Sequence, residues 1–509
     1  MSEPVLDGVD IQGNILPGFR RAEEMLVGFS GTDPIALRRA LAIIAPHLTC
    51  LATAIDHRDA RKAFFLGNAP DVPSTSLWLN YALGKGATDA LGLSSLGDKD
   101  AAFVAGMVPS RTGDSSNASL PDGSRNPAAP PNWVVGGPVR KLDLLLIFAA
   151  DENIENAVRP IVDAVRDCGL IQIYSEVGRL LPEDKEHFGF QDGISNPGVL
   201  GVVDVGGVRR FVTTRYGVPD RNGVSFGKPG QPLLDPEQFL FDADELRNGS
   251  FLVFRRLQQD VAKFYLDTSE LAKSISTETG EFVSPEAVRA RIVGRWPSGQ
   301  PLMRPVADPN RPESQFAINH FEFASALPEL VLSSGDKVAA ATGDPQVANG
   351  GRCPIWAHIR KVNPRDLPTD KGGADETRGF QMLRRGIPFG PQFDHGNLAS
   401  PTNTAERGLL FLAYQTSISQ QFETLNGDWM NTELNPSPGG FDLLVGQRLT
   451  LTRLNDAKPA MWFDQPTGKT IPIVASSQWV LPTGGAYLFA PSIGWTRKQS
   501  AGNSRAGHS

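Results

Sequence analysis

The chain has 509 residues, of which 40% are hydrophobic and 21% charged, and these values are typical of a soluble globular protein. That length exceeds one compact core of ordinary size and predicts two domains of about 200–250 residues each. The formal net charge is −7, from 49 basic and 56 acidic residues, and no arginine-rich tract is present, so we do not expect a nucleic-acid partner.

Cysteine usage and the N-terminal residues predict a cytoplasmic protein. Cys50, Cys168 and Cys353 are odd in number and widely spaced, which argues against a disulfide framework. Residues 1–7 lack the basic and apolar regions of a secretory signal, although export by another route stays open. The longest apolar stretch, residues 144–150, is too short to span a membrane.

The first part of the chain alternates β and α patterns after a long loop. Residues 110–132 are rich in Ser, Asn, Asp, Gly and Pro and predict a loop or a lid. Residues 141–149 read as a buried strand, residues 152–167 as a helix, and residues 170–177 as a second strand. Pro160 inside the helical pattern predicts a kink or a later helix start.

A similar unit follows in the second part. Residues 249–254 are strand-like, and residues 257–271 have the apolar spacing of a helix. Residues 284–293 predict another helix, because a serine N-cap is followed by proline at the first helical position. Residues 485–489 form a short β run, and residues 497–509 are predicted to be frayed.

These patterns divide the chain into two α+β halves. The boundary falls in residues 220–236, which are rich in glycine and proline. We therefore predict an N-terminal domain over residues 1–225 and a C-terminal domain over residues 226–509.

An acidic turn is the first candidate for chemistry. In residues 189–193, Gly-Phe-Gln-Asp-Gly, Asp192 lies between glycines, which permit positive φ and close approach of the backbone to another group. A carboxylate on such a turn can be aimed at a ligand, although an ordinary surface loop is the commoner explanation. The residues that follow are Ile194-Ser195-Asn196-Pro197.

The second candidate is His358, which lies between an apolar stretch and a basic run. It is the best ligand candidate among seven histidines, although a buried structural histidine is the commoner case. The neighbouring Arg360 is suited to acidic groups such as haem propionates, and a solvated basic face is the alternative. Cys353 is a weaker candidate, as a thiolate ligand of haem.

Three further features accompany them. Arg384 lies between apolar residues and precedes a turn rich in glycine and proline. Residues 408–414 form an apolar strand able to wall a cavity, although such a strand is more often plain core. Asp442 is a second acid in an apolar turn.

The combination resembles the dye-decolorizing peroxidases, a family of haem peroxidases, over essentially the whole chain. The segments that carry the resemblance, in the family's order, are residues 10–15 (Asp-Ile-Gln-Gly-Asn-Ile), 189–193, 291–299 (Arg-Ile-Val-Gly-Arg-Trp-Pro-Ser-Gly), 357–361, 384–390 and 408–414. The resemblance implies an α+β fold of two ferredoxin-like domains with antiparallel sheets and peripheral helices, of the dimeric α+β barrel type. Haem b would be held mainly by the C-terminal domain.

The resemblance also implies roles on the distal side of the haem. Asp192 would be the distal acid and Arg384 the distal arginine, with Arg385 as the adjacent alternative. Leu409 and Phe411 would line the distal pocket. Because an ordinary aspartate has a pKa of about 3.9, we expect activity to favour acid pH.

On the proximal side, His358 would be the ligand of the haem iron. Asp442 would accept the other ring N–H of His358, which increases the basicity of the imidazole. Arg360 would meet a haem propionate.

The implied activity is the oxidation of bulky dyes, phenolics and similar one-electron donors by hydrogen peroxide, and Mn(II) oxidation stays open. The alternative is a haem-binding protein that releases iron for iron acquisition. A homo-oligomer stays open, and none of the eight tryptophans and six tyrosines stands out as an electron relay.

Overall fold

The computed structural model describes residues 3–65, 77–114, 116–119, 123–214, 233–332, 335–398, 400–435, 440–447, 458–464, 468–475 and 478–501. Within these ranges, no helix has the length and apolar character needed to cross a membrane. The predicted domain boundary near residue 225 lies outside them, so the division into two domains stays a prediction.

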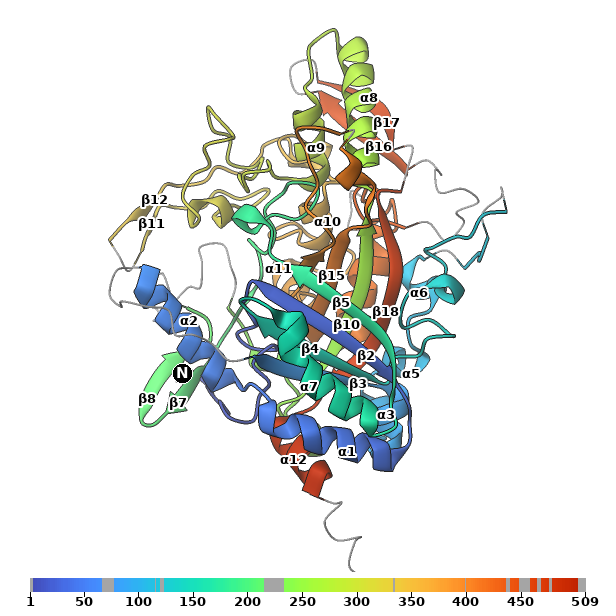
Figure 1. Ribbon diagram of the computed structural model, residues 1–509. Helices are drawn as coiled ribbons and strands as arrows, with labels where there is room; N and C mark the ends of the chain where they lie inside the picture. Colours follow the sequence, from blue (N-terminus) through green and yellow to red (C-terminus); the bar gives the residue numbers. More distant parts are fainter. Residues whose placement is uncertain are drawn as a thin grey trace, which may run out of the picture.

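The first half contains one ferredoxin-like repeat. Its strands follow the order β3-β4-β2-β5 across the sheet and all pair antiparallel. Two helices connect them and cover one face (Figure 1). The elements are β2 (Glu23–Ser30), α1 (Pro34–Ile44), β3 (Trp78–Gly84), β4 (Leu144–Ala150), α7 (Ile154–Asp167) and β5 (Ile171–Arg179).

The second half repeats this arrangement. The strands follow the order β18-β10-β15, and β13 and β14 both pair with the far edge of β15. The elements are β10 (Ser250–Gln259), α8 (Val261–Thr279), α9 (Pro285–Val293), β13 (Leu383–Arg384), β14 (Ile387–Phe389), β15 (Gly408–Gln415), the π-helix η9 (Ile418–Met430) and β18 (Val480–Ala490).

The two repeats join into one closed sheet. Strand β18 pairs with β3 through Leu488 and Gly84, and β5 pairs with β14 through Gly178 and Phe389. Because β10 also pairs with β15, the strands return to their starting point and form a barrel. The expected fold class, two ferredoxin-like units of the α+β barrel type, is confirmed.

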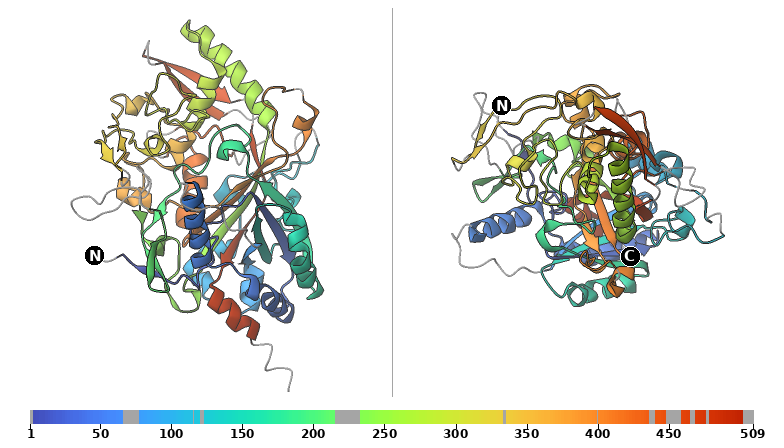
Figure 2. Two further views of the ribbon diagram at one scale, coloured as in Figure 1. Left: turned by 60° about the vertical axis from the view of Figure 1, so that its left-hand side comes forward. Right: turned by 90° about the horizontal axis from the view of Figure 1, so that it is seen from above.

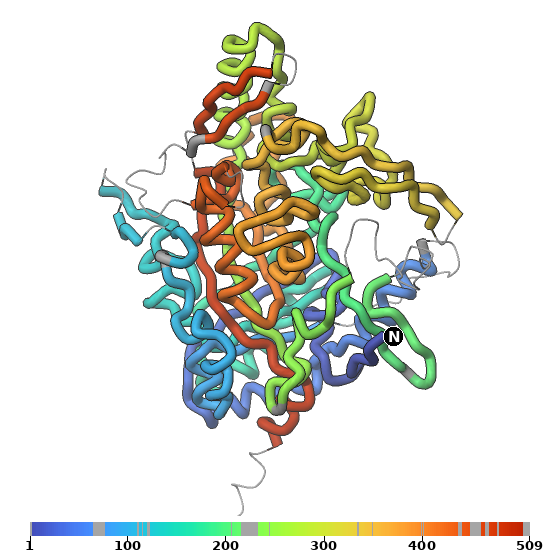
Figure 3. Tube along the Cα trace, turned by 180° about the vertical axis from the view of Figure 1, so that it is seen from behind, coloured from blue at the N-terminus to red at the C-terminus, as the bar shows by residue number. Residues whose placement is uncertain are grey.

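The remaining elements lie around this barrel. Figure 2 shows α12 beside α1 at one end, and the view from behind follows β18, in red, down to α12 (Figure 3). They are β1 (Val5–Leu6), α2 (Leu51–Phe65), α3 (Lys85–Ala90), α4 (Leu96–Lys99), α5 (Ala101–Ala105), α6 (Pro109–Thr112), β6 (Gly198–Val199), β7 (Val202–Val205), β8 (Val208–Phe211), β9 (Leu233–Leu234), β11 (Leu330–Val331), β12 (Lys337–Val338), α10 (His358–Val362), α11 (Ala374–Arg378), β16 (Lys458–Asp464), β17 (Lys469–Ala475) and α12 (Ile493–Ala501).

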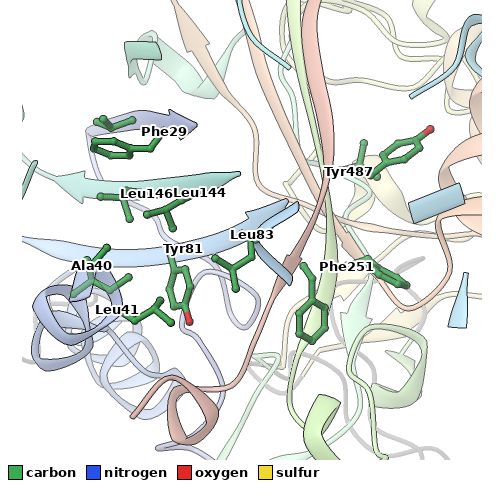
Figure 4. Close-up of a cluster of buried hydrophobic side chains, with 14 of the residues drawn as sticks. Phe29, Ala40, Leu41, Tyr81, Leu83, Leu144, Leu146, Phe251 and Tyr487 are labelled. Carbon is green, nitrogen blue, oxygen red and sulfur yellow. The ribbon is translucent and has the colours of Figure 1, made fainter. Parts of the chain in front are cut away.

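The sheet is buried on both faces, and successive residues of a strand serve different faces. In β15, Leu410, Leu412 and Tyr414 belong to the cluster inside the barrel. On the outer face, the cluster drawn in Figure 4 runs from Phe29 and Leu144 of the first repeat to Phe251 and Tyr487 of the second. One outer core thus continues across both repeats.

Most predicted elements are present, with three corrections. The helix predicted from residue 257 begins at Val261, because β10 continues to Gln259 and Asp260 caps the helix by accepting from the amide of Lys263. The helix α7 begins at Ile154 and includes Pro160, so this proline does not mark a later helix start. The tail predicted to fray from residue 497 is helical as far as Ala501, because α12 packs on α1.

Candidate active site

His358 is the first residue of α10, and its side chain contacts a buried carboxylate 84 residues further along the chain. Its Nδ1–H donates to Oδ2 of Asp442 at 2.8 Å, which is the contact expected between these two residues. Asp442 is fully buried, and its Oδ1 accepts from the amides of Leu444 and Val445 at 2.9 and 3.1 Å. The carboxylate is therefore held from both sides.

The electrostatics of this pair determine the tautomer of His358. Burial alone would raise the pKa of Asp442, but the charge and hydrogen bond of His358, the amide of Val445 and the charge of Lys361 together bring it below its ordinary value. When His358 is neutral, the ionised Asp442 accepts a hydrogen bond from its Nδ1–H, and this tautomer has a lone pair on Nε2. Nε2 has no partner among the described residues, and the His358 side chain is 28% exposed.

The structure corrects the expected role of Arg360. This residue lies on the opposite side of α10, 3% exposed, and donates to the carbonyls of Cys353 and Val347 at 2.7 Å each. The guanidinium also lies over the ring of Phe323. Because these backbone contacts occupy it, Arg360 anchors α10 and is not presented to a propionate.

The Asp192 turn has the backbone that its glycines predict. Gly189 and Gly193 have φ of 92° and 73°, a region that residues with a Cβ rarely adopt. The amide of Asp192 donates to the carbonyl of Asp184 at 3.1 Å, and Oδ1 of Asp192 accepts from the amide of Gly193 at 2.6 Å. The Asp192 side chain is exposed.

Glu186 stabilises the same turn through hydrogen bonds to its backbone amides. Its carboxylate accepts from the amides of Phe188 and Phe190 at 2.9 Å each and from the side-chain amide of Gln259 at 2.6 Å. Burial raises the pKa of Glu186 to about 7, against the effect of these hydrogen bonds. One partly buried acid thus holds the start of the turn.

Arg384 and Arg385 point to different faces of the sheet. Arg385 donates to the carbonyls of Asn14, Ile15 and Arg384 at 2.8–3.0 Å. The residues two positions before and after it, Leu383 and Ile387, belong to the cluster inside the barrel. The guanidinium of Arg384 makes no hydrogen bond or ion pair with the described residues. This geometry favours Arg384 over Arg385 as the arginine available to a ligand.

Arg384 shares one sheet face with the two predicted lining residues. It pairs with Ala413 of β15, and Leu409 and Phe411 occupy alternate positions on the same strand. Both are only half-buried, as is Leu257, which pairs with Leu409 from β10. The π-helix η9 packs on β10 and on α10, so it links this face to the helix of His358.

The structure also reveals a contact to which sequence reasoning assigned no role. Asn196, four residues after Asp192, donates from Nδ2 to the carbonyl of Arg384 at 3.0 Å and accepts at Oδ1 from its amide at 3.1 Å. The only sequence signal was the position of Asn196 directly behind the glycine turn. The acidic turn and the arginine segment, 188 residues apart, are joined here.

The donor set fits haem. A neutral imidazole whose Nδ1 is fixed by a buried carboxylate is a typical iron ligand. The half-buried apolar face of Leu409, Phe411 and Leu257 suits a porphyrin. A thiolate ligand is disfavoured, because burial raises the pKa of Cys353 to about 11 and keeps the thiol protonated.

Comparison with known proteins agrees with this site. A multifunctional dye peroxidase from Amycolatopsis is 31% identical over 373 residues, which are 70% of each chain. A dye-decolorizing peroxidase from Mycetinis scorodonius is 29% identical over 96% of this chain and 86% of its own length. No family model matches the chain.

Solved structures extend the likeness to three dimensions. An ancestral D-type dye-decolorizing peroxidase superposes with a TM-score of 0.71 at 27% identity, over 97% of this chain and 99% of that one. A fungal DyP-type peroxidase from Auricularia auricula-judae gives a TM-score of 0.69 at 25% identity, over 97% of this chain and 99% of that one. The fold and the site thus define a haem peroxidase.

The chain belongs to the dye-decolorizing peroxidase family. It is a peroxidase, and its cofactor is haem b.

Proposed function

We propose that the chain reduces hydrogen peroxide at a haem b held by His358 and oxidises bulky dyes and phenolics in one-electron steps. The observation that carries this proposal is the contact between His358 and the buried Asp442. His358 would hold the haem, which would supply the iron site for peroxide and the electrons needed to break the O–O bond. The overall reaction consumes two protons and two electrons and yields two waters, and two donor molecules return the electrons.

Asp192 and Arg384 are the residues proposed to handle charge during this cleavage. Asp192 would accept the proton from one peroxide oxygen and deliver it to the other, which would leave as water. The guanidinium of Arg384 stays charged throughout and stabilises the negative charge that develops on that oxygen. Asp442 keeps the proton on Nδ1 of His358 and thereby leaves Nε2 available as the atom that would hold the haem iron.

Single substitutions of the two distal residues test this proposal. We expect Asp192→Asn and Arg384→Leu each to lower the second-order rate constant with peroxide by about 10²-fold or more, because each removes a proton acceptor or a charge stabiliser. Stopped-flow mixing of purified holoenzyme with peroxide measures it. If wild-type holoenzyme consumes no peroxide in the presence of a dye, the proposed function is wrong.

Further proposals concern the substrate range and the domain organisation of the chain. No group of three or more His, Cys, Asp or Glu residues in the described part of the chain is placed to hold a metal ion, so the structure adds no support for Mn(II) oxidation. We also propose an N-terminal domain over residues 1–225 and a C-terminal domain over residues 226–509, because three of the four proposed haem-site residues named in the preceding paragraphs and the strand of Leu409 and Phe411 follow residue 225. A cytoplasmic location and a homo-oligomer are retained as proposals.

The iron-release alternative has limited support. A deferrochelatase from Yersinia pestis is 33% identical over 102 residues, which are 19% of this chain and 20% of its own length. Incubation of the holoprotein without peroxide distinguishes the two functions, because iron release leaves a fluorescent metal-free porphyrin and a peroxidase leaves haem intact.

A further inference from the structure

Strand β13, which carries Arg384, lies at the end of the strand order. In an antiparallel pair, the peptide groups of successive residues point alternately toward and away from the partner strand. The amide of Arg385 donates to the carbonyl of Leu412 in β15 at 2.7 Å, so its peptide group points inward. The amide and carbonyl of Arg384 therefore point outward, where an edge strand leaves its polar groups unpaired.

The side chain of Asn196 meets both of these outward groups. Its Oδ1 accepts from the amide of Arg384 at 3.1 Å, and its Nδ2 donates to the carbonyl of Arg384 at 3.0 Å. One carboxamide thus reproduces the two hydrogen bonds that a neighbouring strand would make. At neutral pH, where aspartate is ionised, no other natural side chain of this length offers a donor and an acceptor side by side in a planar group.

Asn196 is joined just as directly to the acidic turn. Its amide donates to the carbonyl of Gly193 at 3.4 Å, which closes a four-residue turn. The ends of such a turn lie within about 7 Å of each other, and Asp192 immediately precedes it. The position of Asp192 relative to Arg384 therefore depends on the turn of residues 193–196 and on the hydrogen bonds of the Asn196 side chain to Arg384.

We propose that Asn196 is a positioning residue that fixes where Asp192 lies relative to Arg384. This inference rests on the proposed function, because it concerns the same distal pair. Asn196 itself touches neither peroxide nor cofactor in this assignment. It acts through the backbone of Arg384, and its loss lets the turn and the edge strand move independently.

Ser195 provides a matched control, because it lies on the same segment but is tied elsewhere. Its hydroxyl donates to Oδ1 of Asn319 at 2.8 Å and accepts from Arg295 at 3.0 Å. Ser195→Ala removes comparable hydrogen bonds without touching Arg384. If the loss of any hydrogen bond in this segment lowers activity, Ser195→Ala and a substitution of Asn196 should therefore lower it alike.

The first test is a double-mutant cycle on holoenzyme. Asn196→Leu keeps the approximate shape of the side chain and removes both hydrogen bonds, and we expect the rate constant with peroxide to fall about 10²-fold, as for a misplacement of about 1 Å. In an Arg384→Leu background the same substitution should have almost no further effect, because the group it positions is gone. A fall of equal size in both backgrounds, or an equal fall for Ser195→Ala, would show a merely structural role and overturn the proposal.

The second test uses the pH profile of Asn196→Asp. An ionised carboxylate presents an acceptor to the carbonyl of Arg384 and repels it, whereas a protonated carboxyl donates there and restores the pattern of asparagine. The activity of Asn196→Asp relative to wild type should rise about tenfold from pH 7 to pH 4. A ratio that does not change with pH contradicts the proposal.

The third test needs no activity. Hydrogen exchange followed by mass spectrometry, on both apo- and holoprotein, should show faster exchange in a peptide containing residues 383–385 for Asn196→Leu than for Ser195→Ala. Unchanged exchange in that peptide overturns the proposed link even if the enzyme is inactive. A wild-type protein that shows this protection but consumes no peroxide would instead disprove the proposed function and leave the link standing.

Discussion

His358 and Arg360 lie two residues apart on one short helix, yet their side chains face different surroundings. His358 faces Asp442, whereas Arg360 is buried against the carbonyls of Cys353 and Val347. The basic run of the sequence indicated anion binding but carried no information on direction. In a helix of five residues, a shift of two positions turns a side chain by about 200°, which decides whether it meets a ligand or the protein interior.

At the level of single residues, the first prediction concerns Asp442. Asp442→Asn keeps the shape of the side chain but removes the charge that fixes the Nδ1 proton and increases the basicity of His358. We expect a loss of about 10–100-fold in peroxidase activity or haem affinity, together with a rise in the iron reduction potential. Spectroelectrochemical titration of the holoprotein measures the potential.

Asp344 is the matched control for this substitution. It is also a buried carboxylate that accepts from backbone amides, those of Gln346 and Arg352, but it contacts no histidine among the residues that the structure describes. Asp344→Asn should leave the reduction potential at the wild-type value. An equal rise in both variants would mean that His358 does not respond to the charge of Asp442.

The second residue prediction concerns Glu24, a buried acid inside the barrel. Burial raises its pKa to about 8, and the charge of Arg385 offsets part of that effect. Because the folded protein holds this proton more tightly than the unfolded chain, Glu24 lowers the stability as pH rises from its ordinary pKa of 4.5 toward 8. Glu24→Gln mimics the protonated form and should remove this dependence.

We therefore expect Glu24→Gln and wild type to have similar unfolding free energies at pH 4 and the variant to be more stable by a few kcal/mol, on the order of 2–4, at pH 8. Urea unfolding of the apoprotein at both pH values measures the difference. A variant that is less stable at pH 8 would show that the carboxylate makes a favourable ionic contact there.

At the level of elements, the segment predicted as a loop or lid has a specific anchor. Asp114, which follows α6 (Pro109–Thr112), accepts from the guanidinium of Arg255 on β10 at 2.9 and 3.0 Å. Both side chains are almost fully buried, with 4% exposure for Arg255 and 1% for Asp114. The polar composition of the segment concealed this contact, because one charged residue can enter a core when its partner lies on a distant strand.

Asp114→Asn should destabilise the protein by about 3–5 kcal/mol, since it leaves the charge of Arg255 buried and uncompensated. Thermal and denaturant unfolding measure this change. The exposed pair Arg166–Asp163 is the matched control, and Asp163→Asn should change stability by less than about 1 kcal/mol. Equal effects at the two sites would contradict the buried-charge explanation.

For the whole molecule, the closed sheet makes the two repeats one folding unit. At one junction, Gly178 of β5 faces Phe389 of β14, and an added Cβ would meet Ile387 and the carbonyl of Pro388. Gly178→Ala should therefore destabilise the protein by about 1–3 kcal/mol through overpacking. Circular dichroism and tryptophan fluorescence should report one common unfolding transition that shifts as a whole.

Gly97 in α4 is the control for this substitution, because an added Cβ there meets only Val104, at 3.4 Å. Gly97→Ala should leave the unfolding midpoint unchanged or raise it slightly. If Gly178→Ala separates the two probes into distinct transitions, the repeats unfold independently and the barrel is not one cooperative unit.

The sequence by itself determined the family, the two α+β repeats and the residue types of the site. The reason is physical: the glycines around Asp192, the apolar run of β15 and the N-cap of α9 are local features that can be recognised from neighbouring residues alone. The tertiary structure decided which groups meet. The contact of His358 with Asp442 and that of Asn196 with Arg384 join positions 84 and 188 residues apart, and only the closure of the sheet and the packing of the helices bring such positions within hydrogen-bonding distance.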